Sequence, residues 1–341
     1  MKLTRRALNR ATLARQMLLQ RERVTPLDAV ARLAGMQAQI PKPPFIGLWT
    51  RLEDFDAAEL RALIAKKKVV RATLMRGTIH LVTTADFLAW RMPIQPVLDT
   101  VVGEHDIEKL TSIAHEFFEE PRPFDALRKH LAELFPGENE RQLAYAIRLK
   151  VPLVLVPDDS PWGWAGNAPF AIAETYLGKK IRKSLDAREL ALRYLAAFGP
   201  ATAADFQTWS GLRTAKAVFE ELRPQLVAFE GEKKKSELFD LPDAPRPDED
   251  SPAPVRFLPE YDNLLLAHAD RTRVIADEHR QKVATQNLRI VGTFLVDGVV
   301  AGTWAVPKKK GQKIELEPFV KLDRASQKAL DAEASALAAF L

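Results

Sequence analysis

The chain has 341 residues, 47% of them hydrophobic and 28% charged, a composition typical of globular proteins long enough for roughly two to four domains. The absence of cysteine excludes disulfides, iron–sulfur clusters and thiolate zinc sites. No apolar run approaches the ~20 residues of a membrane helix, and no hydrophobic segment of a signal peptide follows the basic N-terminus, so we expect a cytoplasmic protein.

The net charge of +5 is small, but it is unevenly distributed. Residues 1–25 contain one acidic side chain, Glu22, and seven basic ones: Lys2, Arg5, Arg6, Arg10, Arg15, Arg21 and Arg23. Such an excess fits either a helix that faces a polyanion or an ordinary solvated helix face. For a DNA partner, Arg5 and Arg6 are candidate phosphate contacts.

Helical periodicity dominates the first part of the chain. Helices are predicted from Thr4 to Leu19, from Pro26 to Met36 and from Asp56 to Lys66. They precede KVVRATLMRGTIHLVT, residues 68–83, where two extended runs are separated by Arg76-Gly77. This pattern predicts a β-hairpin after the helices.

The same order of elements occurs a second time. Residues 124–135 and 139–149 predict helices, and residues 151–157 predict a strand. A turn then leads to a return strand expected through residues 164–166.

A third copy has the clearest pattern. Helices are predicted over residues 187–198, within 199–211 and over 213–222. Residues 225–241 predict a strand, a basic turn with lysines at 233–235, and a second strand.

The remainder of the chain is different in character. Residues 240–254, DLPDAPRPDEDSPAP, contain five prolines and no periodicity, which indicates a linker. Strand patterns follow, with a hairpin turn expected at Asp297-Gly298 and a closing helix from Arg324 onward. The predicted division is a first unit at 1–110, a second at 111–180, a third at 181–240, a linker at 241–254 and a C-terminal β-rich, barrel-like domain at 255–341.

Helix, turn, helix and a two-stranded ribbon is the order of a winged helix, so we expect an α+β fold with three tandem winged-helix units. Such units place a helix in a DNA groove and basic wings on phosphates, which favours double-stranded DNA as the partner. Three units in one chain can surround a duplex as a monomer, whereas a repressor usually dimerises. The alternative function is a non-catalytic winged-helix transcription or nucleoid protein.

Most other kinds of site are absent from the sequence. It has no histidine pair at metal-ligand spacing, no Walker loop, no GxGxxG before a helix and no lysine marked as a nucleophile, so we expect no metal and no cofactor. Glu260 and Asp262 in PEYD could act in acid–base chemistry, or could cap a turn and pair with Arg271 or Arg273.

Two neutral polar residues, Gln37 and Gln39, stand in GMQAQIPKPP, and they can act only through hydrogen bonds. In an extended segment both amides would lie on the same side, and the prolines that follow favour an exit from the helix near Gln37. In the alternative interpretation, the amides only satisfy carbonyls at the frayed helix end.

Four stretches in order, LTRRALNRATLARQMLL, GMQAQIPKPPFIGLWTRL, VVRATLMRGTIHLVT and FLPEYDNLLLAHADRTRVI, resemble the winged-helix DNA glycosylases of the AlkZ and YcaQ type. The resemblance covers most of the chain. It implies a concave scaffold of three winged helices that binds duplex DNA, with Gln37 and Gln39 at the positions of the catalytic glutamine, apolar, glutamine motif. YcaQ relatives have Asp at the second position, so Gln39 places the chain nearer the AlkZ branch.

A glutamine can orient water but cannot transfer a proton, which predicts a substrate base that is already cationic, such as an N7-alkylated purine. The AlkZ resemblance adds bulky adducts and interstrand crosslinks as possible substrates. Arg76, Thr78 and His80 alternate along the predicted hairpin and are candidate DNA contacts; otherwise they belong to a solvent-facing wing. Trp162 and Trp164 could stack on bases or pack on their own helices. We therefore expect a monofunctional glycosylase associated with the nucleoid.

Overall fold

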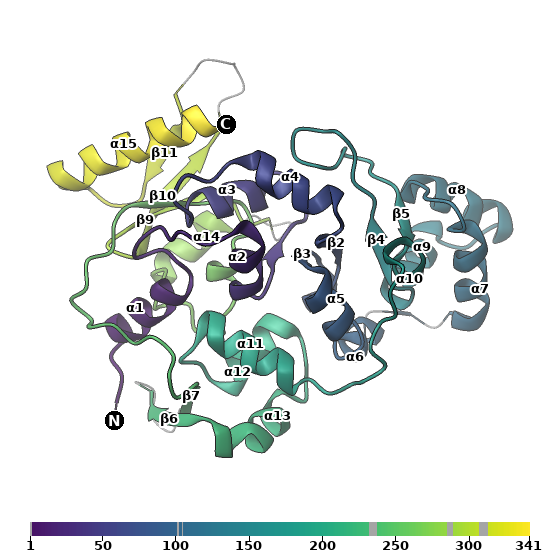
Figure 1. The fold of residues 1–341 in the computed structure, drawn as a ribbon, viewed down its shortest axis with the longest axis horizontal. Helices are drawn as coiled ribbons and strands as arrows, with labels where there is room; N and C mark the ends of the chain where they lie inside the picture. Colours follow the sequence, from purple (N-terminus) through teal and green to yellow (C-terminus); the bar gives the residue numbers. More distant parts are fainter. Residues whose placement is uncertain (1, 101, 104, 232–236, 285–288, 307–312) are drawn as a thin grey trace.

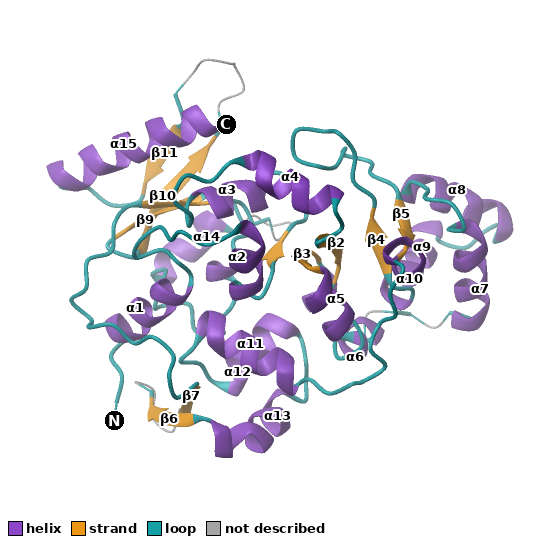
Figure 2. Ribbon diagram, viewed as in Figure 1, coloured by secondary structure: helices purple, strands orange, loops and turns teal. Residues whose placement is uncertain are grey.

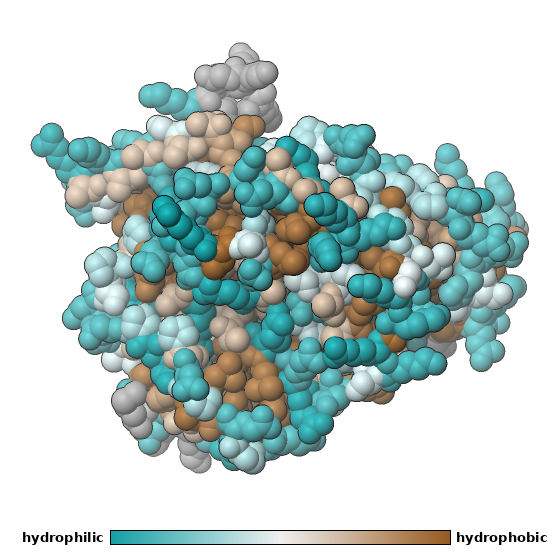
Figure 3. Space-filling view, in the orientation of Figure 1, coloured by the Kyte–Doolittle hydropathy of each residue, from teal (hydrophilic) through white to brown (hydrophobic). Residues whose placement is uncertain are grey.

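In the computed structural model, α-helices and antiparallel strands alternate along the chain (Figure 1). The structure describes residues 2–100, 102–103, 105–231, 237–284, 289–306 and 313–341. Within these ranges the strands form sheets of five, four and two strands, each flanked by helices (Figure 2). The face shown in Figure 3 is largely hydrophilic, with apolar side chains visible between the polar ones.

The first helices begin where side chains satisfy free backbone N–H groups. Thr4, Thr25 and Asp56 each accept a hydrogen bond from the first turn of the helix that follows. The first elements are α1 (Arg5–Arg15), α2 (Pro26–Arg32), β1 (Met36–Gln37), α3 (Pro43–Trp49), α4 (Ala57–Ala65), β2 (Val69–Thr73) and β3 (Ile79–Thr83).

Helix α2 ends at Arg32, so the helix predicted to reach Met36 is too long. Ala34 and Gly35 both adopt positive φ, 52° and 83°, which stops the helix and turns the chain into β1. A Cβ on Gly35 would lie 2.5 Å from Val82 Cγ1, so the turn also needs the absence of a side chain.

Pro43 and Pro44 start helix α3 instead of only ending the preceding one. N–H groups in the first turn of a helix have no partner within the helix, so a proline there costs no hydrogen bond. The fixed φ of proline also suits a helix. Helix α3 was not predicted from the sequence.

The predicted hairpin of β2 and β3 is present, with Arg76-Gly77 in its turn, but it is not a free wing. Both strands are buried along their whole length, and β2 pairs with β4 (Leu153–Leu155) through Ala72 and Val154. The resulting sheet has the order β1-β3-β2-β4-β5. Its last strand is β5 (Phe170–Ile172), a few residues after the return strand expected at 164–166.

Helices surround this sheet, and those of the second unit lie at the right of Figure 1. The two predicted helices form as α8 (Phe124–Leu134) and α9 (Glu140–Lys150), and their apolar residues pack with those of the sheet. Four further helices that were not predicted are α5 (Thr84–Trp90), α6 (Gln95–Asp99), α7 (Ile107–Phe117) and α10 (Ala173–Leu177).

The third unit follows the predicted order and lies along the bottom of Figure 1. Its elements are α11 (Arg188–Phe198), α12 (Ala203–Ser210), α13 (Ala215–Leu222), β6 (Val227–Glu230) and β7 (Glu237–Asp240). Thr202 and Asp205 form a capping box at the start of α12. The basic turn expected at 233–235 lies outside the described residues.

The C-terminal part contains an open sheet and not the barrel-like domain that was expected. Its order is β11-β10-β9-β8, so β8 and β11 form two edges; four strands are too few to close a barrel around packed side chains. The turn at Asp297-Gly298 is confirmed by positive φ at both residues. The elements are β8 (Arg256–Leu258), α14 (Arg280–Val283), β9 (Thr293–Val296), β10 (Val299–Ala305), β11 (Glu315–Pro318) and α15 (Arg324–Phe340).

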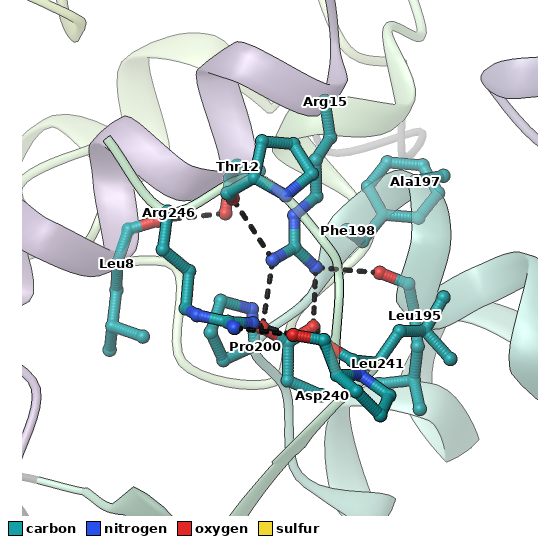
Figure 4. A network of polar contacts seen from close by, with 12 residues as sticks. Leu8, Thr12, Arg15, Leu195, Ala197, Phe198, Pro200, Asp240, Leu241 and Arg246 are labelled. Carbon is teal, nitrogen blue, oxygen red and sulfur yellow. Dashed lines mark hydrogen bonds and ion pairs between the residues drawn. The ribbon is translucent and has the colours of Figure 1, made fainter. Parts of the chain in front are cut away.

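The segment 241–254 is irregular in structure, but it is fixed to α1 by charged groups. Arg15 of α1 forms a bidentate ion pair with Asp240 at distances of 2.7 and 2.8 Å, and both side chains are buried (Figure 4). Arg246 also bonds Asp240, at 2.5 Å. Arg10 donates to the Ser251 carbonyl, so the segment lies against the first helix along much of its length.

No helix in the described part of the chain is long and apolar enough to cross a membrane.

Candidate functional site

Gln37 and Gln39 lie at the edge of the five-stranded sheet. Gln37 belongs to β1 and faces His80 of β3 in the antiparallel register, and the Ala38 N–H donates to the Ile79 carbonyl at 2.8 Å. The motif is therefore extended and is held by the neighbouring strand. The expected extended geometry is present, although the strand begins after a turn and not at a helix end.

The two glutamine amides are oriented by bonds to their oxygens. Gln37 Oε1 accepts a hydrogen bond from Arg76 Nη2 at 2.8 Å, and Gln39 Oε1 accepts one from the Ile79 N–H at 3.1 Å. Gln37 is buried and Gln39 is half-buried. Within the described residues, neither Nε2 amide is committed to a hydrogen bond, and each Oε1 retains a second acceptor position.

Arg71 of β2 supports the backbone of the motif from inside the sheet. Its Nε donates to the Ala38 carbonyl at 2.8 Å and its Nη2 donates to the Gln39 carbonyl at 2.9 Å. Its guanidinium lies 5.6 Å from the ring centroid of Trp164. Burial lowers the pKa of Arg71 to about 10, so it remains a cation at neutral pH. Sequence reasoning did not identify it, because its role depends on contacts between strands.

Of the two tryptophans considered for base stacking, Trp164 is buried and Trp162 is half-buried. Trp164 is buried and donates from Nε1 to the Leu155 carbonyl at 3.2 Å. Trp162 makes an edge-to-face contact with Phe45 of α3, with ring centroids 5.1 Å apart. The observed contacts of both tryptophans are with other parts of the protein, and Trp164 lies beside Arg71, which bonds the motif.

Arg76 connects the hairpin turn to the motif and to the third unit. Its backbone is left-handed, with φ of 57°, and its Nη1 donates to the Trp209 carbonyl at the end of α12. Burial, and then the nearby charge of Arg271, lower the pKa of Arg76 to about 10. The Thr78 hydroxyl donates within the turn to the Met75 carbonyl at 3.0 Å. Arg76 and Thr78 are both half-buried, so the structure leaves part of each accessible.

His80 does not reach the surface, which corrects the expectation that it contacts DNA or belongs to a solvent-facing wing. It is fully buried, its Nδ1 lies 3.1 Å from the Thr78 carbonyl, and its Nε2 has no hydrogen-bond partner among the described residues. Burial and the charge of Arg76 lower its pKa to about 3. His80 instead lies within the sheet, where it is the pairing partner of Gln37 across the strands.

The buried state of His80 predicts a pH dependence of stability. Because histidine titrates near 6.5 in an unfolded chain, only the unfolded state gains a proton as the pH falls from about 6.5 toward 3. The free energy of unfolding should therefore fall by up to ~1.4 kcal/mol per pH unit for this group. Burial, and then the charge of Arg273, lower the pKa of His268 to about 3, so this residue adds a similar dependence.

We expect His80→Gln to remove this contribution from the slope of unfolding free energy against pH, measured by urea titration at several pH values between about 6 and 4. His115→Gln, a change at an exposed histidine of α7, is the matched control. An unaltered slope in His80→Gln would show that His80 is not held neutral.

The PEYD loop borders the motif. A small pocket is lined in part by Gln37, Pro43, Pro44 and residues 259–263. Its cavity volume is about 10 Å³. That is roughly the volume that one water molecule needs. Asn263 Nδ2 fixes the contact by donating to the Gly35 carbonyl at 3.2 Å.

The two carboxylates of PEYD have different environments. Asp262 is buried, accepts from Arg51 Nη2 at 3.0 Å and caps the turn at Leu264, so it has the structural role considered for it, although with Arg51 and not Arg271 or Arg273. Glu260 pairs with Arg289 at the rim of the pocket.

The N-terminal arginines lie apart from this site. Arg6 is exposed and pairs with Asp297 of the C-terminal hairpin at 2.6 Å. Arg5 is exposed and borders a wider hollow lined also by Lys216 and Arg273. Arg5 and Arg6 thus lie at other surfaces than Arg76 and Thr78, so the structure divides the predicted DNA-binding residues between two places.

Gln37 and Gln39 supply hydrogen-bond donors and acceptors to the site, but a glutamine amide cannot act as a general base. No group of three or more His, Asp or Glu side chains that could hold a metal occurs in the described ranges. Its amides can orient a water molecule and interact with a sugar or a base.

The chain is similar to known proteins over most of its length. Among curated proteins, the chain is similar to the Interstrand DNA cross-link repair glycosylase of Streptomyces sahachiroi, with 25% identity over 358 residues that cover 95% of this chain and 93% of the relative. Among solved structures, it is similar to the Streptomyces sahachiroi DNA glycosylase AlkZ, with a TM-score of 0.80 and 20% identity over 100% of this chain and 97% of that one. The latter likeness shows the fold. The family model described as DNA glycosylase AlkZ-like matches residues 30–340.

Proposed function

Because the chain belongs to the AlkZ-like DNA glycosylase family, we propose that it hydrolyses the N-glycosidic bond of cationic N7-alkylated purines in duplex DNA, with Gln37 and Gln39 positioning the water. The observation that carries the proposal is the fixed, extended motif, whose two amides retain free donors and acceptor positions. The resemblance stated from four stretches of sequence is confirmed at the level of the family.

The chemistry requires no acid from the protein when the base is cationic. The oxygen of water forms a bond to the anomeric carbon, the bond from that carbon to the base nitrogen breaks, and its electron pair neutralises the departing purine. The proton of the attacking water passes to solvent. Gln37 and Gln39 hold the water in line with the breaking bond, which reduces the entropy cost of the reaction. No lysine is required, so the enzyme is monofunctional.

The small pocket supports a shallow mode of recognition. Space of about 10 Å³ cannot enclose a purine, so the damaged base stays outside the pocket while water is held within reach. A base that is not enclosed can carry a large substituent or a link to the opposite strand. We therefore include bulky adducts and interstrand crosslinks as substrates, in line with the name of the Streptomyces relative.

The scaffold in this proposal is three winged-helix units, at 1–110, 111–180 and 181–240, followed by the segment 241–254 and the C-terminal domain. The support is the recurring order of helices and an antiparallel strand pair, most completely in α11 to β7. The protein acts as a monomer on nucleoid DNA.

The test is excision from duplexes that contain one N7-methylguanine or one N7-linked interstrand crosslink, compared with the undamaged duplex. We expect an abasic product from the damaged duplexes alone, and no strand cleavage before treatment with alkali. Tight binding without an abasic product from any of these duplexes would contradict the proposal and favour a non-catalytic DNA-binding protein.

A further inference from the structure

The small pocket beside the motif is bordered by two side-chain amides that come from different parts of the chain. Gln37 of β1 and Asn263, which directly follows PEYD, both line it. Asn263 Nδ2 also donates to the Gly35 carbonyl at 3.2 Å, so the loop is joined to the segment that enters β1. The pocket volume of about 10 Å³ leaves room for one water molecule.

Other polar side chains around the pocket are already bonded to the protein. Arg51 donates to Asp262 at 3.0 Å, and both side chains are buried. Gln16 Nε2 donates to a backbone carbonyl of α11 at 2.8 Å. Glu260 forms an ion pair with Arg289. These bonds fix the walls of the pocket.

Asn263 and Gln37 each keep one polar end that the protein does not use. Asn263 Oδ1 is buried and has no hydrogen-bond partner among the described residues. Its amide orientation is defined, because Nδ2 has to face the Gly35 carbonyl, which can only accept. Gln37 Oε1 is held by Arg76, and Nε2 makes no hydrogen bond within the described ranges. One free acceptor and one free donor group therefore border the same small pocket.

The loop that carries Asn263 has a defined conformation. Tyr261 has a left-handed backbone with φ of 61°, which is unusual for an aromatic residue. Asp262 accepts from the Leu264 N–H at 3.0 Å in addition to its bond from Arg51. Asn263 is thus held in place from both sides before any DNA is bound.

We propose that Asn263 Oδ1 accepts a hydrogen bond from the attacking water, which in turn accepts one from Gln37 Nε2, so that Asn263 is a third catalytic residue. This inference rests on the proposed function and deepens it. An ordered water in a cavity needs at least two polar partners, and these two amides supply an acceptor and a donor. A buried acceptor that is otherwise left without a partner is costly, and the water satisfies it.

The acceptor has a chemical role that the N–H group of Gln37 does not have. Donation to Asn263 Oδ1 directs one O–H of the water into the pocket and increases the electron density on its oxygen. A lone pair then forms the bond to the anomeric carbon, while the electron pair of the breaking bond leaves with the cationic purine. The amide oxygen does not keep the proton, which passes to solvent.

Replacement of Asn263 by leucine, which has a similar size and no polar atom, tests the contact. We expect the single-turnover rate of N7-methylguanine excision to fall by ~10²-fold, the usual effect of a misplaced reactant. Affinity for a duplex that carries a tetrahydrofuran abasic analogue, which contains no bond for the enzyme to cleave, should stay at the wild-type value.

Asn9→Leu is the matched control. Asn9 is buried in α1 and its Nδ2 also donates to backbone carbonyls, at 2.7 and 2.8 Å, but it does not line the pocket. Its rate should remain that of the wild type. A folded Asn263→Leu protein with the wild-type rate, or an equal loss of rate in Asn9→Leu, would overturn the proposal.

Asn263→Asp separates the contact with water from the contact with Gly35, and it decides the question if Asn263→Leu does not fold. A protonated carboxyl can donate to the Gly35 carbonyl, whereas a carboxylate repels it. If Asn263 acted only on Gly35, the excision rate relative to wild type would fall as the pH rises through the titration of the new carboxyl group. A carboxylate beside the water can instead act as a general base, which contributes ~10²–10⁴-fold in known enzymes. We therefore expect the relative rate to rise with pH, and a flat or falling ratio would contradict the proposal.

A high-resolution crystal structure of the wild-type protein tests the water site without any reaction. We expect one ordered water within ~3 Å of both Asn263 Oδ1 and Gln37 Nε2, and a pocket without it would overturn the proposal. A protein that holds this water but excises no base loses the glycosylase proposal and retains the water site. A protein that excises N7-methylguanine equally well after Asn263→Leu loses this inference alone.

Discussion

Replacement of Gln37 by alanine is expected to lower the rate of N7-methylguanine excision by ~10²-fold, since a misplaced reactant costs about that factor. The amide oxygen of Gln37 is fixed by Arg76, so the side chain is already oriented before DNA binds. Gln39→Ala should have a similar effect, because its amide is fixed by the Ile79 N–H. Single-turnover assays under saturating enzyme measure the chemical step.

The double variant Gln37→Ala and Gln39→Ala should lose less than the product of the two single effects, because both amides act on one water. Gln142→Ala, at an exposed glutamine of α9, is the matched control and should retain the wild-type rate. Affinity for the abasic-analogue duplex should change little in the double variant. Excision at the wild-type rate by the folded double variant would exclude these glutamines from catalysis.

Replacement of Asp240 by alanine is expected to destabilise the protein by ~3–5 kcal/mol, as is typical when one partner of a buried ion pair is removed. Asp240 receives bonds from Arg15 and from Arg246, and the side chain of Arg15 is almost fully buried (Figure 4). The variant leaves Arg15 in the interior without its counter-charge. Urea unfolding followed by tryptophan fluorescence and far-UV circular dichroism measures the loss.

Asp243→Ala is the control for this change, since Asp243 lies in the same segment and is exposed. It should alter the free energy of unfolding by less than ~0.5 kcal/mol. A loss below ~1 kcal/mol for Asp240→Ala, the range of exposed pairs, would show that the pair contributes little to holding α1 against the third unit.

Local sequence signals predicted much of the fold. The hairpin turns at Arg76-Gly77 and Asp297-Gly298 form as expected, each with a glycine that readily adopts positive φ. Helix α4 lies close to its expected position, whereas α1 ends at Arg15, before the expected end at Leu19. Helix α3 was missed because Pro43 and Pro44 were interpreted as a stop, although prolines also start helices. The open C-terminal sheet depends on strand pairings that local pattern does not encode.

The candidate site was only partly predictable. Gln37 and Gln39 could be named from sequence because they form a compact motif with a family resemblance. The burial of His80 could not, since strict alternation along a strand does not tell which face a neighbouring unit covers. The role of Arg71 could not be predicted for a similar reason. Arg71 contacts the motif only once strands that are far apart in the sequence have paired.

The pairing of β2 with β4 has a consequence for how the protein can be divided. The sheet crosses from the first unit into the second, so removing residues after about position 110 would leave β2 as an unprotected edge with free N–H and carbonyl groups. Such fragments would associate or unfold, and the glutamine motif on β1 would lose its support. The amide hydrogens of β2, β3 and β4 should therefore be protected from exchange to the same degree, because the three strands unfold together. Neither of the two units should fold by itself.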